Sequence, residues 1–246
     1  MSEPQEDSFI SHLVELRDRL LRAVVAVVAI FVCLMPWAGD IYDILAHPMM
    51  SALPEGTKMI ATGVVTPFFV PMKVTLLVAF VIALPFVLYQ AWCFIAPGLY
   101  AHEKRLGLPL VVGSTVLFLA GMAFCYFFVF GTVFKFIAQF APKSITPAPD
   151  IEQYLAFVMS MFLAFGITFE VPVIVIVLVK LGIVDVAKLK EALPYVIVGA
   201  FVIAAVVTPP DVVSQLMLAI PMCLLYELGI FLARFVTAKG HQPVSD

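Results

Sequence analysis

The chain has 246 residues, of which 63% are hydrophobic, 13% aromatic and only 13% charged, and its mean hydropathy is +1.09. Soluble domains carry about 45–50% apolar and about 25% charged residues, so this composition excludes a soluble enzyme, a disordered chain and a disulfide-stapled secreted domain. The net charge of −3 provides no basic field, which argues against nucleic acid as a partner. We therefore predict an all-α, polytopic membrane protein.

Apolar runs long enough to cross a bilayer recur along the chain. A helical span needs about 20 apolar residues to cross about 30 Å of hydrocarbon. The sequence predicts six transmembrane helices in a single membrane domain over residues 1–246, at about residues 23–38, 68–96, 106–138, 154–179, 194–207 and 212–233. The fifth reaches only about 21 Å at about 1.5 Å per residue, and the break at 208–211 leaves it in a tight hairpin with the sixth. We expect the fifth and sixth spans to be short.

Lysine and arginine are divided unequally between the two sides of this predicted bundle. With the N-terminus in the cytoplasm, four of the 14 basic residues fall on the external side, namely Lys58, Lys73, Lys135 and Lys143, and the other ten fall on the cytoplasmic side. An excess of Lys and Arg marks the cytoplasmic loops of membrane proteins. Both termini are therefore predicted to be cytoplasmic (N-in/C-in), with an amphipathic N-terminus over 1–22 and a tail over 234–246.

The stretch 8–21 has the pattern of an amphipathic helix. Its apolar residues at helical spacing are Phe9, Leu13, Leu16 and Leu20. On the other face, Glu15 is spaced i,i+4 from Arg19, and Asp18 is spaced i,i+4 from Arg22, so two ion pairs are expected. The simplest interpretation is an interfacial helix with solvated salt bridges.

Two acidic residues lie at the predicted cytoplasmic rim. Glu103 stands at the start of the third span, where the helix dipole by itself favours a carboxylate. Glu15 lies on the same membrane face. Two separate carboxylates can each bind one guanidinium through paired hydrogen bonds, which lysine cannot reproduce. The pair therefore favours a cationic, arginine-bearing ligand.

Polar residues inside the apolar runs are the other candidates for function. Glu170 lies within the fourth run, where an acid costs about 2.5–3.5 kcal/mol to insert and usually faces the protein interior or a polar cavity. Thr208 and Gln215 flank the hairpin break. Hydrogen bonds between helices are worth about 0.6–2 kcal/mol in membranes. Gln215 is thus predicted to bind a partner helix or, equally well, to bond within the hairpin.

Signals for catalysis are absent from the sequence. The histidines lie outside the predicted spans, and no Walker A, HExxH or GxSxG motif occurs. The four cysteines sit singly in apolar runs and are expected to be buried hydrophobes. We predict no enzymatic activity, no catalytic residue, no metal and no cofactor, so any work must draw on partners or on the membrane potential.

Four motifs in the sequence resemble those of a known family. They are HLVELRDRL (12–20), FIAPGLYAHEKR (94–105), FLAFGITFEVP (162–172) and TPPDVVSQ (208–215). Together with six spans, they resemble the TatC family, the receptor subunit of the twin-arginine protein translocase. Asp18 departs from the basic residue expected there, and Pro36 in the first span is also unfamiliar.

The resemblance implies a receptor that binds signal peptides bearing consecutive arginines. With the single-span partners TatB and TatA, such a receptor exports folded proteins across the bacterial cytoplasmic membrane, driven by the protonmotive force. The resemblance also implies self-association in a multimeric complex and a concave, glove-like bundle in the lipid bilayer. Glu15 and Glu103 match the positions that recognise the arginine pair, with Arg17 and Phe94 beside them.

Other positions take their expected roles from the same resemblance. Glu170 would face the membrane-side groove. Thr208 and Gln215 match the region where partner helices dock, and Asp211 matches the adjacent loop. Pro48 matches a functionally sensitive site in the first external loop.

Two further hypotheses compete with the receptor. A small proton- or ion-coupled transporter would use Glu170 as its ion site, but it would be expected to have repeated halves, which the sequence lacks. A purely structural scaffold would leave Glu15, Glu103 and Glu170 as coincidences.

Overall fold

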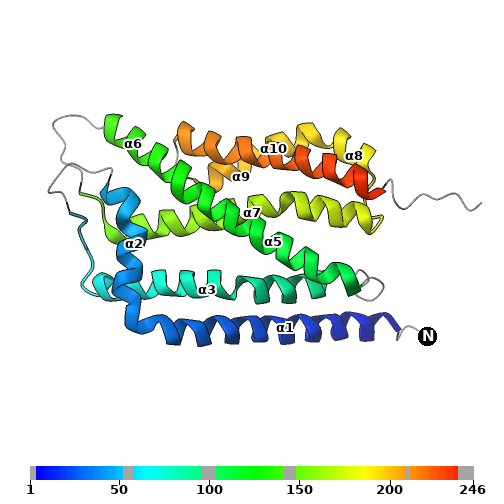
Figure 1. Cartoon of the computed structure of the whole chain (residues 1–246), viewed down its shortest axis with the longest axis horizontal. Helices are drawn as coiled ribbons and strands as arrows, with labels where there is room; N and C mark the ends of the chain where they lie inside the picture. The colour runs from blue at the N-terminus through cyan, green and yellow to red at the C-terminus, as the bar shows by residue number, and fades with distance from the viewer. Residues whose placement is uncertain (1–3, 52–57, 96–103, 141–147, 209–210, 238–246) are drawn as a thin grey trace, which may run out of the picture. The chain divides into compact units, whose positions relative to one another are not determined.

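The computed structural model describes residues 4–51, 58–95, 104–140, 148–208 and 211–237 (Figure 1). Within these ranges no strand occurs, and a single bridge joins Ile60 to Asp150. The elements are α1 (Pro4–Leu34), η1 (Met35–Trp37), α2 (Ala38–Met50), α3 (Thr66–Ile95), α5 (Lys104–Phe124), η2 (Cys125–Val129), α6 (Phe130–Phe140), α7 (Ile151–Lys180), α8 (Val186–Glu191), α9 (Leu193–Val207) and α10 (Val212–Thr237). The predicted all-α class is confirmed.

Among the described residues, five helical segments are long and apolar enough to cross a membrane. They are Leu13–Met50, Thr66–Ile95, Gly107–Ile137, Ile151–Lys180 and Val212–Phe235. The apolar helix α9 has 15 residues and spans about 22 Å, so the fifth span is short as predicted. The prediction of a short sixth span is wrong, because α10 has 26 residues and continues beyond Ala233.

The N-terminal amphipathic stretch and the first span form one helix. α1 runs without interruption from Pro4 to Leu34, because no helix breaker lies between the polar turn and the apolar run. It gives way to η1, whose start contains Pro36, and α2 follows directly. A proline at the start of a helix is tolerated, whereas one inside a helix removes a backbone hydrogen bond. The unfamiliar Pro36 therefore marks the junction between α1 and η1.

The described helices group into two compact units. The first comprises residues up to Leu45 together with Phe68–Thr115, and the second comprises Ala46–Pro67 and the chain from Val116 onward. In the first unit α1 and α3 lie side by side (Figure 1). Trp92 of α3 donates its indole N–H to the Ser114 hydroxyl of α5 at 2.9 Å, inside the unit. This bond satisfies both buried polar groups and joins the two helices.

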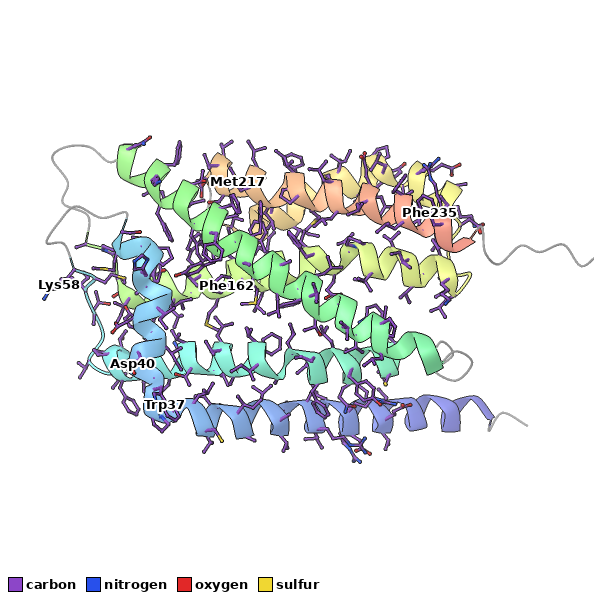
Figure 2. The ribbon with its side chains drawn as sticks, viewed as in Figure 1. Trp37, Asp40, Lys58, Phe162, Met217 and Phe235 are labelled. Atoms are coloured by element: carbon purple, nitrogen blue, oxygen red, sulfur yellow. The ribbon has the colours of Figure 1, made fainter. Side chains whose placement is uncertain are left out.

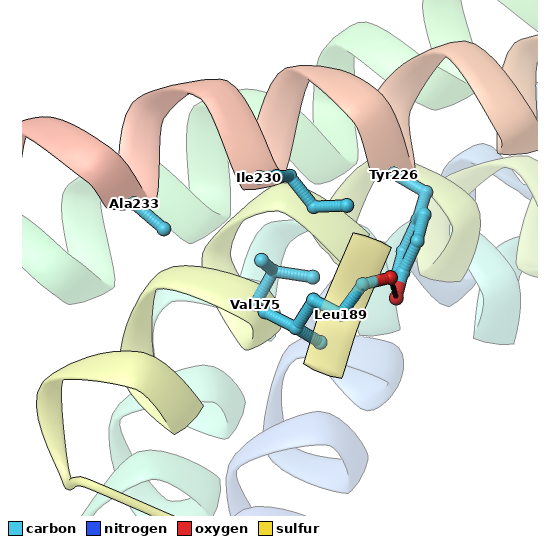
Figure 3. Close-up of a cluster of buried hydrophobic side chains, with 5 residues drawn as sticks. All are labelled: Val175, Leu189, Tyr226, Ile230 and Ala233. Atoms are coloured by element: carbon cyan, nitrogen blue, oxygen red, sulfur yellow. Dashed lines mark hydrogen bonds between the residues drawn. The ribbon is translucent and has the colours of Figure 1, made fainter. Parts of the chain in front are cut away.

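The second unit is built on α7, which packs along α10. Phe162 of α7, labelled in Figure 2, lies 5.2 Å from Phe130 of α6 between ring centroids. At the other end of α7, the buried cluster of Figure 3 comprises Val175, Leu189, Tyr226, Ile230 and Ala233. There the Tyr226 hydroxyl donates to the Leu189 carbonyl oxygen at 2.8 Å, which holds α8 against α10.

Asp150 caps the start of α7 and binds an incoming loop. Its Oδ1 accepts the backbone N–H groups of Glu152 at 2.9 Å and Gln153 at 3.1 Å. Its Oδ2 accepts the hydroxyl of Thr62 at 2.7 Å and the backbone N–H of Thr62 at 3.1 Å. These hydrogen bonds, led by the Thr62 hydroxyl, lower the pKa of Asp150 below its usual value. One carboxylate thus anchors both the helix and the segment before α3.

α5 and α7 approach closely at glycine residues. A Cβ atom added at Gly121 would lie 2.5 Å from the Phe165 carbonyl oxygen, and one added at Gly166 would overlap the ring of Phe118. Membrane helices gain little hydrophobic energy from associating with one another, so small residues that permit close van der Waals contact stabilise the pair.

Replacing Gly121 with alanine tests this contact. Gly121→Ala pushes a methyl group against backbone that cannot rotate away, so we expect a loss of about 1–3 kcal/mol in unfolding free energy. Gly113→Ala, on the same helix with nothing within 4 Å, is the matched control and is expected to be neutral or stabilising by up to about 1 kcal/mol. Denaturant unfolding in detergent measures both, and equal stabilities would contradict the close approach.

The hydrogen bonds that Asp150 accepts from Thr62, Glu152 and Gln153, here called the Asp150 clamp, predict a pH-dependent difference in stability. Because its pKa is lowered in the folded state, the carboxylate stabilises the fold above the usual aspartate value of about 4, and this is lost as pH falls through the folded pKa. Asp150→Asn should therefore melt at a lower temperature than the parent chain at pH 7, with the gap narrowing as the pH falls below about 4. Asp185→Asn is the control, since Asp185 precedes α8 without a side-chain capping bond. A gap that does not narrow as the pH falls below about 4 would refute this account.

Candidate functional site

Glu15 forms an ion pair with Arg19 on α1, as the i,i+4 spacing predicts. Arg19 donates its Nε–H to Glu15 Oε1 at 2.9 Å, and its Nη2 binds the same oxygen. The Arg19 Nη1 also reaches Oε1 of Gln90 on α3, at 3.5 Å. The side chains are 43% exposed for Glu15 and 23% for Arg19. A pair this exposed contributes about 0–1 kcal/mol, so it can be opened at little cost.

Asp18 pairs with Arg17, and the predicted pair with Arg22 is wrong. Arg17 donates to Asp18 Oδ1 from Nε at 3.0 Å and from Nη2 at 2.8 Å. Adjacent residues do not normally face each other on a helix, but the Arg17 side chain is 66% exposed and long enough to curl round to its neighbour. Arg22 makes no ion pair within the described part of the chain. Both acids of this turn are therefore neutralised by arginines from the same helix.

An apolar groove runs between α1 and α3 beside the Glu15–Arg19 pair. It encloses about 190 Å³. Its lining comprises Leu16, Arg19, Leu20, Ala23, Val87, Gln90, Ala91, Phe94 and Ile95. Phe94, expected from the family resemblance to lie near the recognition site, is thus brought to the same groove as Arg19. A groove of this kind can hold an apolar segment next to a charged group.

The structure places some predicted recognition residues and omits another. Glu15, Arg17 and Phe94 are described, whereas Glu103 lies outside the described residues, which resume at Lys104. Gln90, which was not among the predicted site residues, contacts Arg19 in the structure. Its signal was present, because a polar amide inside the apolar run of the second span is as unusual as the acid of the fourth.

Glu170 lies on α7 and is only 7% exposed. Thr168, two residues earlier, is also buried, and its hydroxyl has no hydrogen-bond partner among the described residues. Pro172 follows inside the same helix without ending it. α7 therefore carries buried polar groups at the middle of a span, where they are most costly.

Thr208, Asp211 and Gln215 each make a hydrogen bond within the hairpin. The Thr208 hydroxyl donates to the Ala204 carbonyl oxygen at 2.8 Å, and Thr208 is buried. Gln215 Nε2 donates to the Phe201 carbonyl oxygen at 3.3 Å, so of the two roles predicted for Gln215 the structure contains the bond within the hairpin. Asp211 Oδ1 accepts the Ser214 backbone N–H at 2.7 Å, which caps α10.

The remaining predicted site residue, Pro48, lies inside α2. Its carbonyl oxygen accepts a hydrogen bond from the Ser51 hydroxyl at 3.0 Å at the end of that helix. Over the described ranges no group of three or more His, Cys, Asp or Glu side chains converges as metal ligands. The candidate site is therefore a charged and apolar binding surface on α1 and α3.

Known proteins resemble this chain over nearly all its length. The family model for the Sec-independent protein translocase protein (TatC) matches residues 11–221. The Sec-independent protein translocase protein TatC of Escherichia coli (strain K12) is 50% identical over 240 residues, 98% of this chain and 93% of that protein. The protein of that name from Haemophilus influenzae is 52% identical over 242 residues, with 98% and 93% covered.

A solved structure resembles the fold as well. A crystal structure of the twin arginine translocase receptor TatC superimposes with a TM-score of 0.81 at 40% sequence identity. The match covers 92% of this chain and 99% of the crystallised chain. At this identity, the likeness extends from the fold to the sequence.

Proposed function

Because this chain belongs to the TatC family of Sec-independent protein translocase proteins, we propose that it is the receptor subunit of a twin-arginine translocase. It is a multi-pass membrane protein of the bacterial inner membrane. The observation that carries the proposal is the family match over residues 11–221, which includes both rim acids, Glu15 and Glu103.

Recognition follows from the chemistry of the rim. A guanidinium presents a planar fork of N–H donors that matches a carboxylate through two hydrogen bonds. Glu15 and Glu103 would each bind one arginine of the signal peptide, and the groove that contains Phe94 would receive the adjoining segment. Arg17, which follows the groove residue Leu16 and pairs with Asp18, would tune the local charge. The chain itself would perform no catalysis, and the protonmotive force would drive export.

The orientation proposed for the chain puts this surface on the cytoplasmic side. Ten of the 14 basic residues then face the cytoplasm, as do both termini. Signal peptides of unexported proteins approach from that side. The Asp150 clamp and Pro48 would lie on the external side.

Partner docking is proposed for the hairpin of α9 and α10. α9 carries a stripe of exposed apolar side chains at helical spacing, namely Tyr195, Val198, Val202 and Val206. A helix that is shorter than the hydrocarbon core and has an exposed apolar face is stabilised when a neighbouring helix packs against it. That packing reduces the cost of the difference between helix length and bilayer thickness. TatB and TatA are the proposed occupants, with Thr208, Gln215 and Asp211 shaping the end of the surface, and the receptor would self-associate in the working complex.

Glu170 would provide a polar contact within the membrane for a peptide or a partner helix. A buried acid at mid-span favours local water and a thinner bilayer, which eases the entry of a peptide or partner helix. The alternative of an ion-coupled transporter centred on Glu170 is not supported, because the relatives matched over almost the whole chain are translocase proteins.

Neutralising Glu103 tests the rim. Glu103→Gln should weaken crosslinking of a photoreactive arginine-pair peptide by at least about tenfold and block export, since one charged hydrogen-bonded contact is worth about 1.5–3 kcal/mol. Glu191→Gln, on the predicted cytoplasmic loop before α9, is the matched control and should leave crosslinking unchanged. Undiminished crosslinking in Glu103→Gln, with normal folding, would refute the assigned role.

Replacing Gln215 tests the docking surface. Gln215→Leu removes the bond to Phe201 that joins α9 to α10, so co-purification of a single-span partner should fall about threefold or more while peptide crosslinking stays within about twofold. Gln153→Leu, at the external start of α7, serves as control. A larger effect on the peptide than on the partner would contradict docking at this hairpin.

A further inference from the structure

The carboxylate of Glu15, the proposed recognition residue, already binds Arg19 when no peptide is present. Two nitrogens of Arg19 bind the same oxygen of Glu15, with Nε at 2.9 Å. They use one of the two carboxylate oxygens, and a peptide guanidinium that binds in a bidentate manner would need both. An incoming arginine therefore meets a carboxylate that already holds one.

Arg19 is held in place from a second side. Its Nη1 lies 3.5 Å from Oε1 of Gln90 on the neighbouring helix, and its side chain lines the groove between α1 and α3. It is 23% exposed, against 66% for Arg17 on the open face of the same helix. Arg19 thus has a defined position from which it neutralises Glu15.

The net charge of residues 15–22, about two turns of α1, opposes a cationic ligand. Arg17, Arg19 and Arg22 outnumber the acids Glu15 and Asp18 by one. Asp18 is itself paired with Arg17. Each of these two carboxylates is bound by an arginine, so bidentate binding of a peptide arginine at Glu15 requires Arg19 to leave Oε1.

We propose that Arg19 is an internal competitor at Glu15 and sets the affinity for the arginine pair. The proposal rests on the function proposed above, in which Glu15 binds a signal-peptide arginine. A pair as exposed as this one is weak, so a peptide guanidinium can displace Arg19, and Arg19 can reclaim Glu15 when the peptide leaves. The groove gives Arg19 a place beside Gln90 while Glu15 is engaged.

The test measures the Kd of a fluorescent peptide that carries an arginine pair. The receptor is the full chain, purified with its single-span partners into lipid nanodiscs, at physiological ionic strength. Arg19→Gln frees Glu15 and should tighten binding by about threefold to fivefold, the range set by the strength of an exposed pair. Arg22 lies one turn further along α1 and makes no ion pair among the described residues. Arg22→Gln removes the same charge as Arg19→Gln and should tighten binding by less than about twofold.

The same two substitutions are then made in a Glu15→Gln background. If Arg19 competes for the carboxylate, its extra effect disappears there, and Arg19→Gln changes the Kd no more than Arg22→Gln does. Weaker binding by Arg19→Gln in the parent chain would mean that Arg19 positions Glu15, and this overturns the proposal. Equal effects of Arg19→Gln and Arg22→Gln would overturn it too, since charge alone would explain them.

The Glu15→Gln arm separates the two claims. If Glu15→Gln does not weaken peptide binding, the function proposed for Glu15 fails and the competitor fails with it. If Glu15→Gln weakens binding but the two arginine variants behave alike, only the competitor fails. Should Arg19→Gln unfold, Arg19→Lys keeps the charge and the apolar stem but loses the fork, and it should tighten binding by about twofold.

Discussion

Close backbone contact at glycine is the constraint on which the second unit depends. α7 meets α5 at Gly121 and Gly166, and α10 at Gly229, where an added Cβ atom would lie 2.9 Å from Pro172 Cα. Lipid tails solvate an apolar helix as well as another helix does, so shape and close contact decide which helices associate. α7 can therefore carry the buried Glu170 and Thr168, because its neighbours shield it from lipid.

The proposed recognition surface depends on a different kind of interaction. Glu15 and Arg19 lie on α1, where most residues between Leu13 and Leu34 are exposed. Their pair is half-exposed and weak, in contrast to the dry glycine contacts of α7. This combination of rigid helix packing and a weak surface ion pair suits the proposed receptor. The packing keeps the helices in place, and Glu15 can exchange Arg19 for an arginine of a cationic peptide.

The elements were more predictable than the polar contacts. The span predicted at 154–179 is the helix Ile151–Lys180, and that predicted at 194–207 is Leu193–Val207. Long apolar runs can be recognised from the sequence, because a run of about 20 apolar residues is typical of a membrane span. Asp18 shows the opposite case, since an exposed aspartate has several arginines within reach and spacing alone does not choose between them. Gln215 likewise had two possible roles, and the structure contains its bond to the Phe201 carbonyl oxygen.

The sequence by itself determined the helical class, the succession of spans and the short fifth helix. Each of these follows from hydropathy, chain length or residue type, which are local properties. Only the tertiary structure decided that Gln90 meets Arg19, that Asp150 binds Thr62 and that Phe94 lines a groove with Leu16. Those contacts join residues many positions apart, and they form because packing brings one helix or loop against another, which no local pattern encodes.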